Sequence, residues 1–456
     1  MALAVLDIGK TNAKLILLDA AGATLATRAR PVSVRPGPPY PHLDLDGIWG
    51  WACAALGELG RDAPIDTIVP VTHGAAAVLL ADDEVALPAL DYEFAGPDER
   101  AAAFLSETDP FEATGAPPLP LGLIVGAQLD WQEQHFPEAF ARVTDILPYP
   151  QYWTWRLSGA KACEVTSLGS HTHLWRPYEH AFAHLVEARG WRERFPPLRR
   201  AWEAIGTLRP EVAAATGLSP DCRVLAGIHD SNASYLPYRL GLTPPFTVVS
   251  TGTWVIAMTA GAQAPRLDAE ADVVLNVDAL GDPVPTSRWM GGREIELLAG
   301  ADARNLSADP ASVAALVRAG TMALPSFVAG SGPFPRRAGR IVGDAGTPAA
   351  RSALAALYAA SMADVMLDRL GSGGPVVLEG SFQRNPAFCG LLAALRPEQP
   401  LHVVTDPSGT ARGAYLLSRW PAQKEAQLKL PRAATAWRIE RLDAYRAAWR
   451  AALAPT

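Results

Sequence analysis

Residues 2–19 read ALAVLDIGKTNAKLILLD, and this stretch decides the fold class. Two apolar runs of strand length, residues 2–6 and 13–18, flank a polar turn that contains Gly9, and residues 24–28 can form a third strand. Apolar runs of this length between glycine-containing turns predict a β-meander of buried strands. A dinucleotide-binding domain begins with a β-α-β unit instead, so this opening argues against that class.

The same design recurs in the second half of the chain. Residues 246–249 form an apolar run closed by the turn Ser250-Thr251-Gly252-Thr253, and residues 254–259 form the returning strand. Helical and strand patterns alternate elsewhere, which is typical of an α/β protein. We therefore predict two similar α/β domains, 1–240 and 241–456. One long helical stretch, rich in arginine and tryptophan, is expected at residues 181–214.

Length and composition limit the function. The 456 residues exceed what one hydrophobic core usually serves, 49% of them are apolar, and the formal net charge is −7. No basic block offsets this charge, so we expect no nucleic-acid or membrane partner. The four cysteines are far apart, which argues against a zinc site and a disulfide framework. The N-terminus lacks the basic region and cleavage site of a signal peptide, so a cytoplasmic protein is expected.

Two turns could hold a phosphate through exposed backbone N–H groups, because glycine lets a ligand approach the main chain closely. Either turn by itself could be an ordinary β-turn. Because a similar turn occurs in both halves of the chain, we favour phosphate binding. The candidate phosphate ligands are Gly9, Lys10, Thr11, Asn12 and Lys14 in the first half and Thr251, Gly252 and Thr253 in the second.

Two carboxylates follow apolar strands. Asp7 could hold Mg²⁺ together with nucleotide phosphates, because a buried carboxylate must be solvated, paired or metal-bound, or it could cap the next turn. Asp230 follows the apolar run 224–227 and could act as a general base or as a helix N-cap. His229 could compete for the base role. Three further histidines match no zinc spacing and favour substrate contact or packing: His73, His171 and His173.

Five segments, in chain order, resemble the motifs of the FGGY carbohydrate kinases. They are residues 7–14 (first phosphate motif), 227–234 (catalytic aspartate), 250–253 (second phosphate motif), 378–385 (adenosine motif) and 408–414 (connecting segment). The resemblance implies two ribonuclease-H/actin-like domains with an interdomain cleft. The first domain would bind the sugar, and the second would bind ATP with Mg²⁺.

The resemblance also implies roles for individual residues. Asp230 would be the catalytic base, and Asp7 would orient Mg²⁺. Gly380, Ser381 and Asn385 would frame the adenosine, and the sugar would contact His73, Gly74, Glu164 and His229. The chain departs from the family pattern at Lys10, where a Thr or Ser is usual, at Glu379, where a Gly is usual, and at residues 92–94, where many members carry an Asp-Arg element.

Residues 164–166, 229–231 and 290–294 look most like rhamnulokinase and its relatives. This predicts ATP-dependent phosphorylation of a terminal hydroxyl on a ketose or 6-deoxyketose of the rhamnulose or fuculose type, with a pentulose or polyol as the alternative. A homodimer is expected. A non-catalytic, nucleotide-responsive actin-like regulator is the competing class, and the intact Asp7 and Asp230 argue against it. An actin-like ATPase chaperone is not expected, because no peptide-binding domain is apparent.

Overall fold

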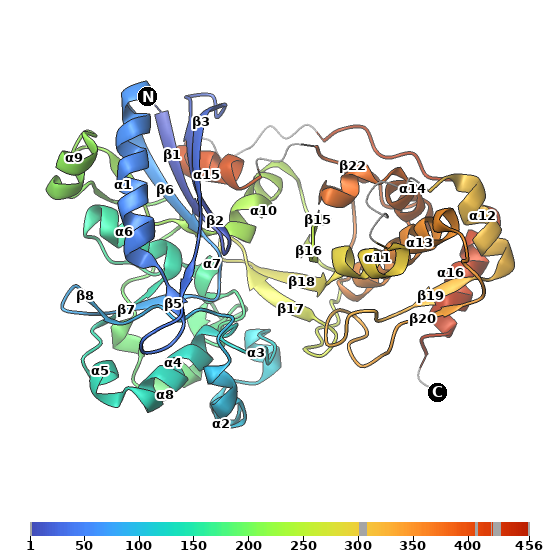
Figure 1. The fold of residues 1–456 in the computed structure, drawn as a ribbon, viewed down its shortest axis with the longest axis horizontal. Coiled ribbons are helices and arrows are strands. Elements are labelled where there is room, and N and C mark those ends of the chain that lie inside the picture. Colours follow the sequence, from blue (N-terminus) through green and yellow to red (C-terminus); the bar gives the residue numbers. More distant parts are fainter. Residues whose placement is uncertain (1, 301–307, 406–408, 421, 423–429, 455–456) are drawn as a thin grey trace. The chain divides into compact units, whose positions relative to one another are not determined.

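The computed structural model describes residues 2–300, 308–405, 409–420, 422 and 430–454. The chain forms two compact units, whose helices and strands Figure 1 labels. Unit 1 contains the chain up to Gly241, Leu275–Pro283 and the segment around α15 (Gly409–Arg419), and unit 2 contains the rest. Two later segments thus belong to unit 1. The predicted domains 1–240 and 241–456, divided at a single boundary, do not include this return of the chain.

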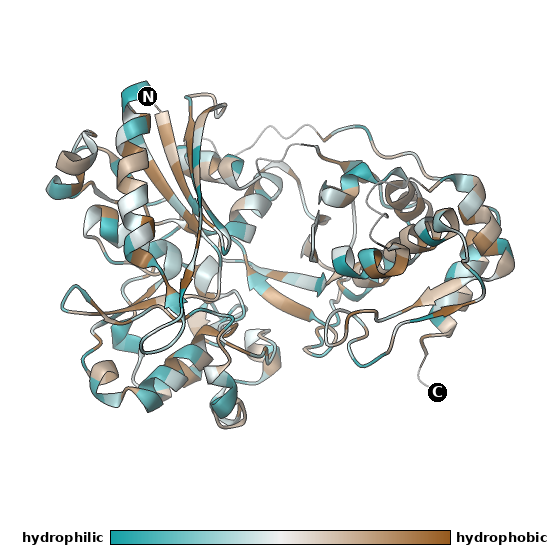
Figure 2. Ribbon diagram, viewed as in Figure 1, coloured by the Kyte–Doolittle hydropathy of each residue, from teal (hydrophilic) through white to brown (hydrophobic). Residues whose placement is uncertain are grey.

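Unit 1 is built on a sheet with the strand order β12-β13-β6-β1-β2-β3. The predicted meander β1-β2-β3 is antiparallel, whereas β6 and β13 join in parallel, and β14 pairs with β6 beyond the end of β13. The central strands are apolar and the edge strand β3 is mixed (Figure 2). These strands are β1 (Ala2–Ile8), β2 (Asn12–Leu18), β3 (Thr24–Pro31), β6 (Ile65–Thr72), β12 (Ala204–Thr207), β13 (Arg223–Leu225) and β14 (Ile228–His229).

Helices and small sheets cover this central sheet. The first helix, α1 (Leu45–Asp62), begins where Asp44 accepts a hydrogen bond from the N–H of Gly47, and its apolar side chains recur every three or four residues and join the strands in one core. The other helices of unit 1 are η1 (Gly96–Arg100), α2 (Ala101–Glu107), α3 (Phe111–Thr114), α4 (Val125–His135), α5 (Pro137–Ala141), α6 (Tyr149–Ser158), α7 (Val165–Leu168), α8 (His184–Ala188), η2 (Arg192–Arg194), α9 (Pro210–Thr216) and α10 (Asp230–Gly241). Its small strands are β4 (Val34–Arg35), β5 (His42–Leu43), β7 (Ala77–Ala81), β8 (Glu84–Leu87), β9 (Asp145–Pro148), β10 (Trp175–Arg176) and β11 (Ala181–Phe182).

The predicted long helix at residues 181–214 is wrong. This stretch contains β11, α8, η2, β12 and α9 in succession. Gly190 ends α8 with a φ of +64°, and Pro196 and Pro197 lack the N–H groups that a helix interior requires. The arginine and tryptophan content indicated a helix, but Gly190, Pro196 and Pro197 interrupt it.

Unit 2 repeats the topology of unit 1. Its sheet has the order β17-β18-β16-β15-β21-β22, with antiparallel pairing from β18 to β15 and parallel pairing from β15 to β22. The long helix α13 (Pro348–Arg369) is buried over most of its length in the core of unit 2. The strands are β15 (Phe246–Thr251), β16 (Val255–Ala260), β17 (Val273–Val277), β18 (Pro283–Trp289), β19 (Met322–Leu324), β20 (Arg340–Val342), β21 (Val376–Gly380) and β22 (Leu401–Val403). The remaining helices are α11 (Gly291–Ala299), α12 (Pro310–Ala319), η4 (Ser381–Arg384), α14 (Pro386–Leu395) and α16 (Leu442–Ala451).

Within the described residues, no helix is both long and apolar enough to span a membrane.

One buried carboxyl group in unit 1 has a measurable consequence for stability. Glu164 is the N-cap of α7, is fully buried, and accepts a hydrogen bond from the N–H of Thr166 at 3.0 Å. Burial raises the pKa of Glu164 from 4.5 to about 8, and the hydrogen bonds from Thr166 oppose this shift. The folded protein therefore keeps this proton at a pH where the unfolded chain loses it.

We predict that Glu164→Gln makes the free energy of unfolding less dependent on pH. Because the folded pKa lies above the unfolded one, the stability due to the Glu164 proton is full below pH 4.5 and is lost as pH rises to about 8. The loss is about 1.4 kcal/mol per pH unit, on the order of 5 kcal/mol in total. Thermal unfolding at pH 5 and pH 8 should show the variant gaining stability over the wild type as pH rises. Exposed Glu58→Gln is the control, and a pH-independent difference for Glu164→Gln would contradict the assignment.

Candidate functional site

Two predicted carboxylates meet at one edge of the unit 1 sheet. Strand β6 lies between β1 and β14 and is parallel to both. Asp7 is in register with Val71, and His229 is in register with Thr72. Asp230 comes directly after His229, so the backbones of Asp7 and Asp230 stand roughly two strand spacings, about 10 Å, apart. This edge holds the carboxyl ends of the strands, where open α/β sheets bind ligands.

The electrostatics of Asp7 fit a bound cation. Burial, together with the negative charge of Asp230, raises the pKa of Asp7 from 3.8 to about 6, although Lys14, paired opposite Asp7 on β2, opposes this rise. A carboxylate whose ionisation is opposed by burial and by a second carboxylate gains from a positive ion beside it. Mg²⁺ typically binds through one or two carboxylates together with phosphates and waters, so Asp7 fits such an ion.

The two oxygens of the Asp230 carboxylate differ in their hydrogen bonding. Oδ1 lies 2.6 Å from the backbone nitrogen of Ser231, 3.3 Å from its hydroxyl, and 3.2 Å from Nε2 of His229. No donor to Oδ2 is recorded among the residues that the structure describes. The side chain is 35% exposed. Asp230 therefore presents one fixed oxygen and one oxygen available to accept a proton.

Nε2 of His229 lies beside the Asp230 carboxylate, and the rest of its ring has partners of its own. Nδ1 of the imidazole lies 3.2 Å from the hydroxyl of Ser170 and 3.3 Å from the amide nitrogen of Asn232. Burial lowers the pKa of His229, so the ring is neutral near pH 7, with its hydrogen on Nε2 facing Asp230. Gly74 packs against this ring, because a Cβ atom there would come within 2.9 Å of Nε2.

His73 offers a hydrogen-bond acceptor at the same edge. Its Nδ1 donates to the carbonyl oxygen of Gly74 at 2.7 Å, and its ring contacts those of Tyr92 and Tyr149 with centroids 5.5 and 5.0 Å away. Burial lowers the pKa of His73, so the imidazole is neutral and Nε2 carries a lone pair. Such a nitrogen can accept a hydrogen bond from a hydroxyl group.

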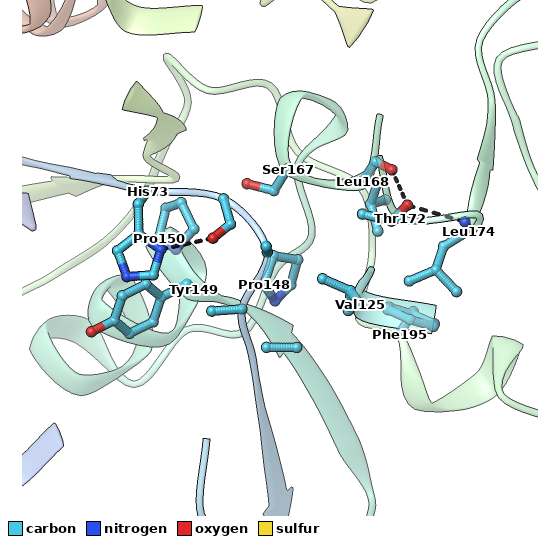
Figure 3. A pocket seen from close by; sticks show the side chains of 14 residues that line it. His73, Val125, Pro148, Tyr149, Pro150, Ser167, Leu168, Thr172, Leu174 and Phe195 are labelled. Atoms are coloured by element: carbon cyan, nitrogen blue, oxygen red, sulfur yellow. Dashed lines mark hydrogen bonds between the residues drawn. The ribbon is translucent and has the colours of Figure 1, made fainter. Parts of the chain in front are cut away.

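A mainly apolar cavity opens beside His73 (Figure 3). It is small, with about 10 Å³ of space for the centre of a water-sized molecule, and His73, Gly74 and Ser167 contribute polar atoms to a wall that is otherwise largely aliphatic and aromatic. Figure 3 shows Tyr149 next to His73, with Val125 and Phe195 at the other end of the cavity. Two of the predicted sugar contacts therefore belong to one hollow of unit 1.

Lys10 has partners that the sequence did not suggest. Its ammonium forms a short ion pair with Asp91, lies 3.3 Å from Glu93, and stands 4.3 Å above the ring of Tyr92. Asp91 is 81 residues away in sequence, so no local pattern could have indicated the pair. In this structure Lys10 fixes the loop at residues 91–93, and its predicted contact with phosphate stays a prediction.

The first predicted phosphate turn is a tight hairpin. Gly9 donates its N–H to the carbonyl oxygen of Asn12 at 2.9 Å, and the backbone of Thr11 accepts from Val32 at 2.9 Å. The side chains of Thr11 and Asn12 are exposed and hydrogen-bond each other at 3.1 Å. The turn directly follows Asp7 and Ile8, so its groups lie at the same sheet edge as the carboxylates.

The second phosphate turn and the predicted adenosine motif meet within unit 2. Thr251 and Gly380 are in parallel register, and the Thr251 hydroxyl donates to the carbonyl of Glu379 at 2.6 Å. A side chain cannot replace the hydrogen of Gly380, because a Cβ atom there would lie 2.0 Å from the oxygen of Thr251 at a φ of +86°. Ser381 beside it is exposed, and its hydroxyl lies 3.3 Å from the same Thr251 oxygen.

Helix α11 begins against the second phosphate turn. Gly292 donates its N–H to the carbonyl of Thr253 at 3.2 Å, and a Cβ atom on Gly292 would lie 2.3 Å from the oxygen of Gly252. The turn itself is closed by the N–H of Gly252, which donates to Trp254 at 2.9 Å. The helix therefore supports Gly252 and Thr253 through direct backbone contact.

Some predicted ligands have structural partners. Asn385 caps α14, since its side-chain oxygen accepts from the N–H groups of Ala387 and Phe388 at 3.1 Å each. The Glu164 carboxyl is buried and bonded to Thr166, so a direct sugar contact by Glu164 or an adenosine contact by Asn385 stays a prediction. Ser408 of the predicted connecting segment lies outside the described residues.

Sequence reasoning missed the residues that hold His229. They are Thr166, Ser170 and Asn232. The spacing of Thr166 and Ser170, four residues apart, was the available signal, because such residues share one face of a helical turn.

Two sequence profiles match the chain. That of the FGGY family of carbohydrate kinases, N-terminal domain, matches residues 114–236, and that of the carbohydrate kinase FGGY, C-terminal domain, matches residues 243–427. The crystal structure of a carbohydrate kinase from Novosphingobium aromaticivorans is similar over 99% of this chain and 98% of its own, with a TM-score of 0.92 and 39% identity.

Curated relatives match over shorter stretches. An L-fuculokinase from Haemophilus influenzae is 30% identical over 180 residues, which is 38% of this chain and 37% of the relative. A xylulose kinase from Escherichia coli is 26% identical over 248 residues, which is 50% of this chain and 48% of the relative. The chain thus aligns with between about a third and a half of these relatives.

The profiles of both halves and the full-length similarity to a solved carbohydrate kinase agree with the site geometry of each unit, and the chain therefore belongs to the FGGY family of carbohydrate kinases.

Proposed function

We propose that the protein transfers the γ-phosphoryl group of ATP to a terminal hydroxyl of an uncharged ketose. The observation that carries this proposal is the asymmetry of Asp230, whose Oδ1 is held by Ser231 and His229 while Oδ2 stays available. A general base needs a fixed position and one accepting atom directed at the proton that it removes.

In this mechanism Asp230 takes the proton from the sugar hydroxyl while the oxygen of that hydroxyl attacks the γ-phosphorus. His73 accepts a hydrogen bond from another sugar hydroxyl through Nε2, and Gly74 leaves room for the ring of His229. Asp7 would hold Mg²⁺, which offsets phosphate charge when bound. The chain supplies position and charge, which account for most of the catalysis in phosphoryl transfer.

We assign nucleotide binding to the two hairpins. The exposed hydroxyls of Thr11 and Thr253, one in each turn, suit phosphate oxygens, and the exposed backbone at Gly380 suits the adenosine. The non-catalytic regulator remains the alternative, and it would bind ATP without sugar-dependent turnover.

The charges of the unit 1 site favour an uncharged substrate. Two ammonium groups, Lys10 and Lys14, stand against four carboxylates: Asp7, Asp91, Glu93 and Asp230. Lys10 is already paired, so a carboxylate on the substrate would meet net negative charge. Among uncharged sugars, residues 164–166, 229–231 and 290–294 support a 6-deoxyketose, whereas the curated relatives include both fuculokinases and xylulose kinases, so a pentulose is the second candidate.

Replacing Asp230 by Asn should lower kcat for sugar-dependent ADP release by at least about 10²-fold, because the amide cannot accept the proton. A coupled ADP assay at saturating ATP measures this effect. Exposed Asp221→Asn, in the same unit, is the control and should keep wild-type turnover. Near-normal turnover by Asp230→Asn would refute the base assignment.

A panel of ketoses, pentuloses, polyols and sugar acids tests the substrate class. We expect kcat/KM for an uncharged ketose to exceed that for a sugar acid of equal chain length by at least about 10-fold, because like charges in a partly buried site cost more than about 1.4 kcal/mol. A preference for the sugar acid would contradict the charge argument.

Gly292→Ala tests the support of the phosphate turn. The added methyl group would push against Gly252, and overpacking costs about 1–3 kcal/mol, so we expect KM for ATP to rise at least about 5-fold with little change in KM for sugar. Gly50→Ala in α1 is the matched control, because its Cβ position is open. An unchanged KM for ATP would show that the contact between α11 and the turn does not affect nucleotide binding.

A further inference from the structure

The short helix α7 lies behind His229 and contacts it through a single hydroxyl. Oγ1 of Thr166 accepts a hydrogen bond from the backbone N–H of His229 at 3.1 Å. The same hydroxyl donates its hydrogen to Oε2 of Glu164 in a short hydrogen bond. Thr166 and Glu164 are both fully buried, so water cannot replace either contact.

The Thr166 hydroxyl binds a backbone N–H of β14 that a neighbouring strand could otherwise bind. Strand β14 has two residues, and in the described part of the chain it pairs with β6 alone. Its register with Val71 and Thr72 fixes one edge, and Thr166 satisfies the N–H of His229 on another side. A two-residue strand held at one edge gives little rigidity, so the side-chain contact matters for the position of the residue that follows, Asp230.

The turn that follows α7 lies beside the ring of His229. Ser170 lies four residues after Thr166, donates to the Thr166 carbonyl at 2.8 Å, and has its hydroxyl 3.2 Å from Nδ1 of His229 and from Oδ1 of Asn276. The backbone N–H of His229 is therefore bonded to Thr166, while Nδ1 of its ring lies near the Ser170 hydroxyl and accepts a hydrogen bond from the side-chain amide of Asn232 at 3.3 Å. The imidazole reaches Asp230 at Oδ1, the oxygen that does not take the proton.

We propose that the Thr166 hydroxyl, supported by Glu164, is a positioning group that fixes Asp230 for catalysis by holding His229. The inference rests on the proposed function, because it requires Asp230 to be the base. A misplacement of about 1 Å can cost on the order of 10²-fold in rate, so loss of this contact should appear in kcat.

The test compares two substitutions of nearly equal size. Thr166→Val keeps the shape and removes the hydroxyl, and we expect kcat to fall about 10- to 100-fold while KM for sugar changes by less than about 3-fold. Thr166→Ser restores the hydroxyl and should recover at least about a third of wild-type kcat. A kcat for Thr166→Val within about 3-fold of wild type, or an equal loss in both variants, would overturn the proposal.

A matched control separates positioning from general destabilisation. Thr216 in α9, a helix that packs against α1, is also buried, and its hydroxyl donates to the carbonyl of Val212 at 2.8 Å. Thr216→Val should lower the melting temperature yet keep wild-type kcat. If Thr166→Val does not fold, Thr166→Ala provides the second measurement, and a kcat for that variant within about 3-fold of wild type would count against the proposal.

A double-mutant cycle with Asp230→Asn links the effect to the base. In that background Thr166→Val should cost less than about 3-fold, because there is no base left to misplace. A full additional loss would show that the hydroxyl acts elsewhere. Failure of the proposed function looks different, because the wild type would then release no ADP in response to any sugar in the panel.

Discussion

The parallel pairing of β1 and β14 with β6 is the constraint on which the site of unit 1 depends. The register sets Asp7 and Asp230 on either side of Val71 and Thr72, at the edge where the strands end. Two carboxylates held at this spacing can serve different purposes, one toward a cation and one toward a proton. A slip of one residue in either pair would turn a carboxylate to the other face of the sheet.

Unit 2 uses the same topology for a different purpose. The strand that corresponds to β1 is β15, and it ends at Thr251 without a carboxylate. Hydroxyls and backbone groups gather at this edge instead, and the glycines at 292 and 380 allow their segments to pack closely against the turn at residues 251–253. The same topology thus presents carboxylates in one unit and neutral hydrogen-bonding groups in the other. For the proposed reaction, the carboxylates suit a cation and the acceptor hydroxyl, and the neutral groups suit the nucleotide.

Much of this could be predicted from the sequence, because the informative features are local. The meander around Gly9, the recurrent turn at Gly252 and the strand-end aspartates all follow from apolar periodicity and turn chemistry. The partners of these residues could not be predicted. The contact of Lys10 with Asp91 and that of Thr166 with His229 join segments far apart in the chain, and tertiary packing alone creates them.

The central claim is that Oδ2 of Asp230 receives the proton of the sugar. A crystal structure of the protein with its sugar, Mg²⁺ and a non-hydrolysable ATP analogue tests this most directly. We expect the acceptor hydroxyl oxygen at roughly 2.6–3.2 Å from Oδ2, with Nε2 of His229 still beside Oδ1. A hydroxyl placed against another side chain, with Oδ2 held by a protein donor, would contradict it.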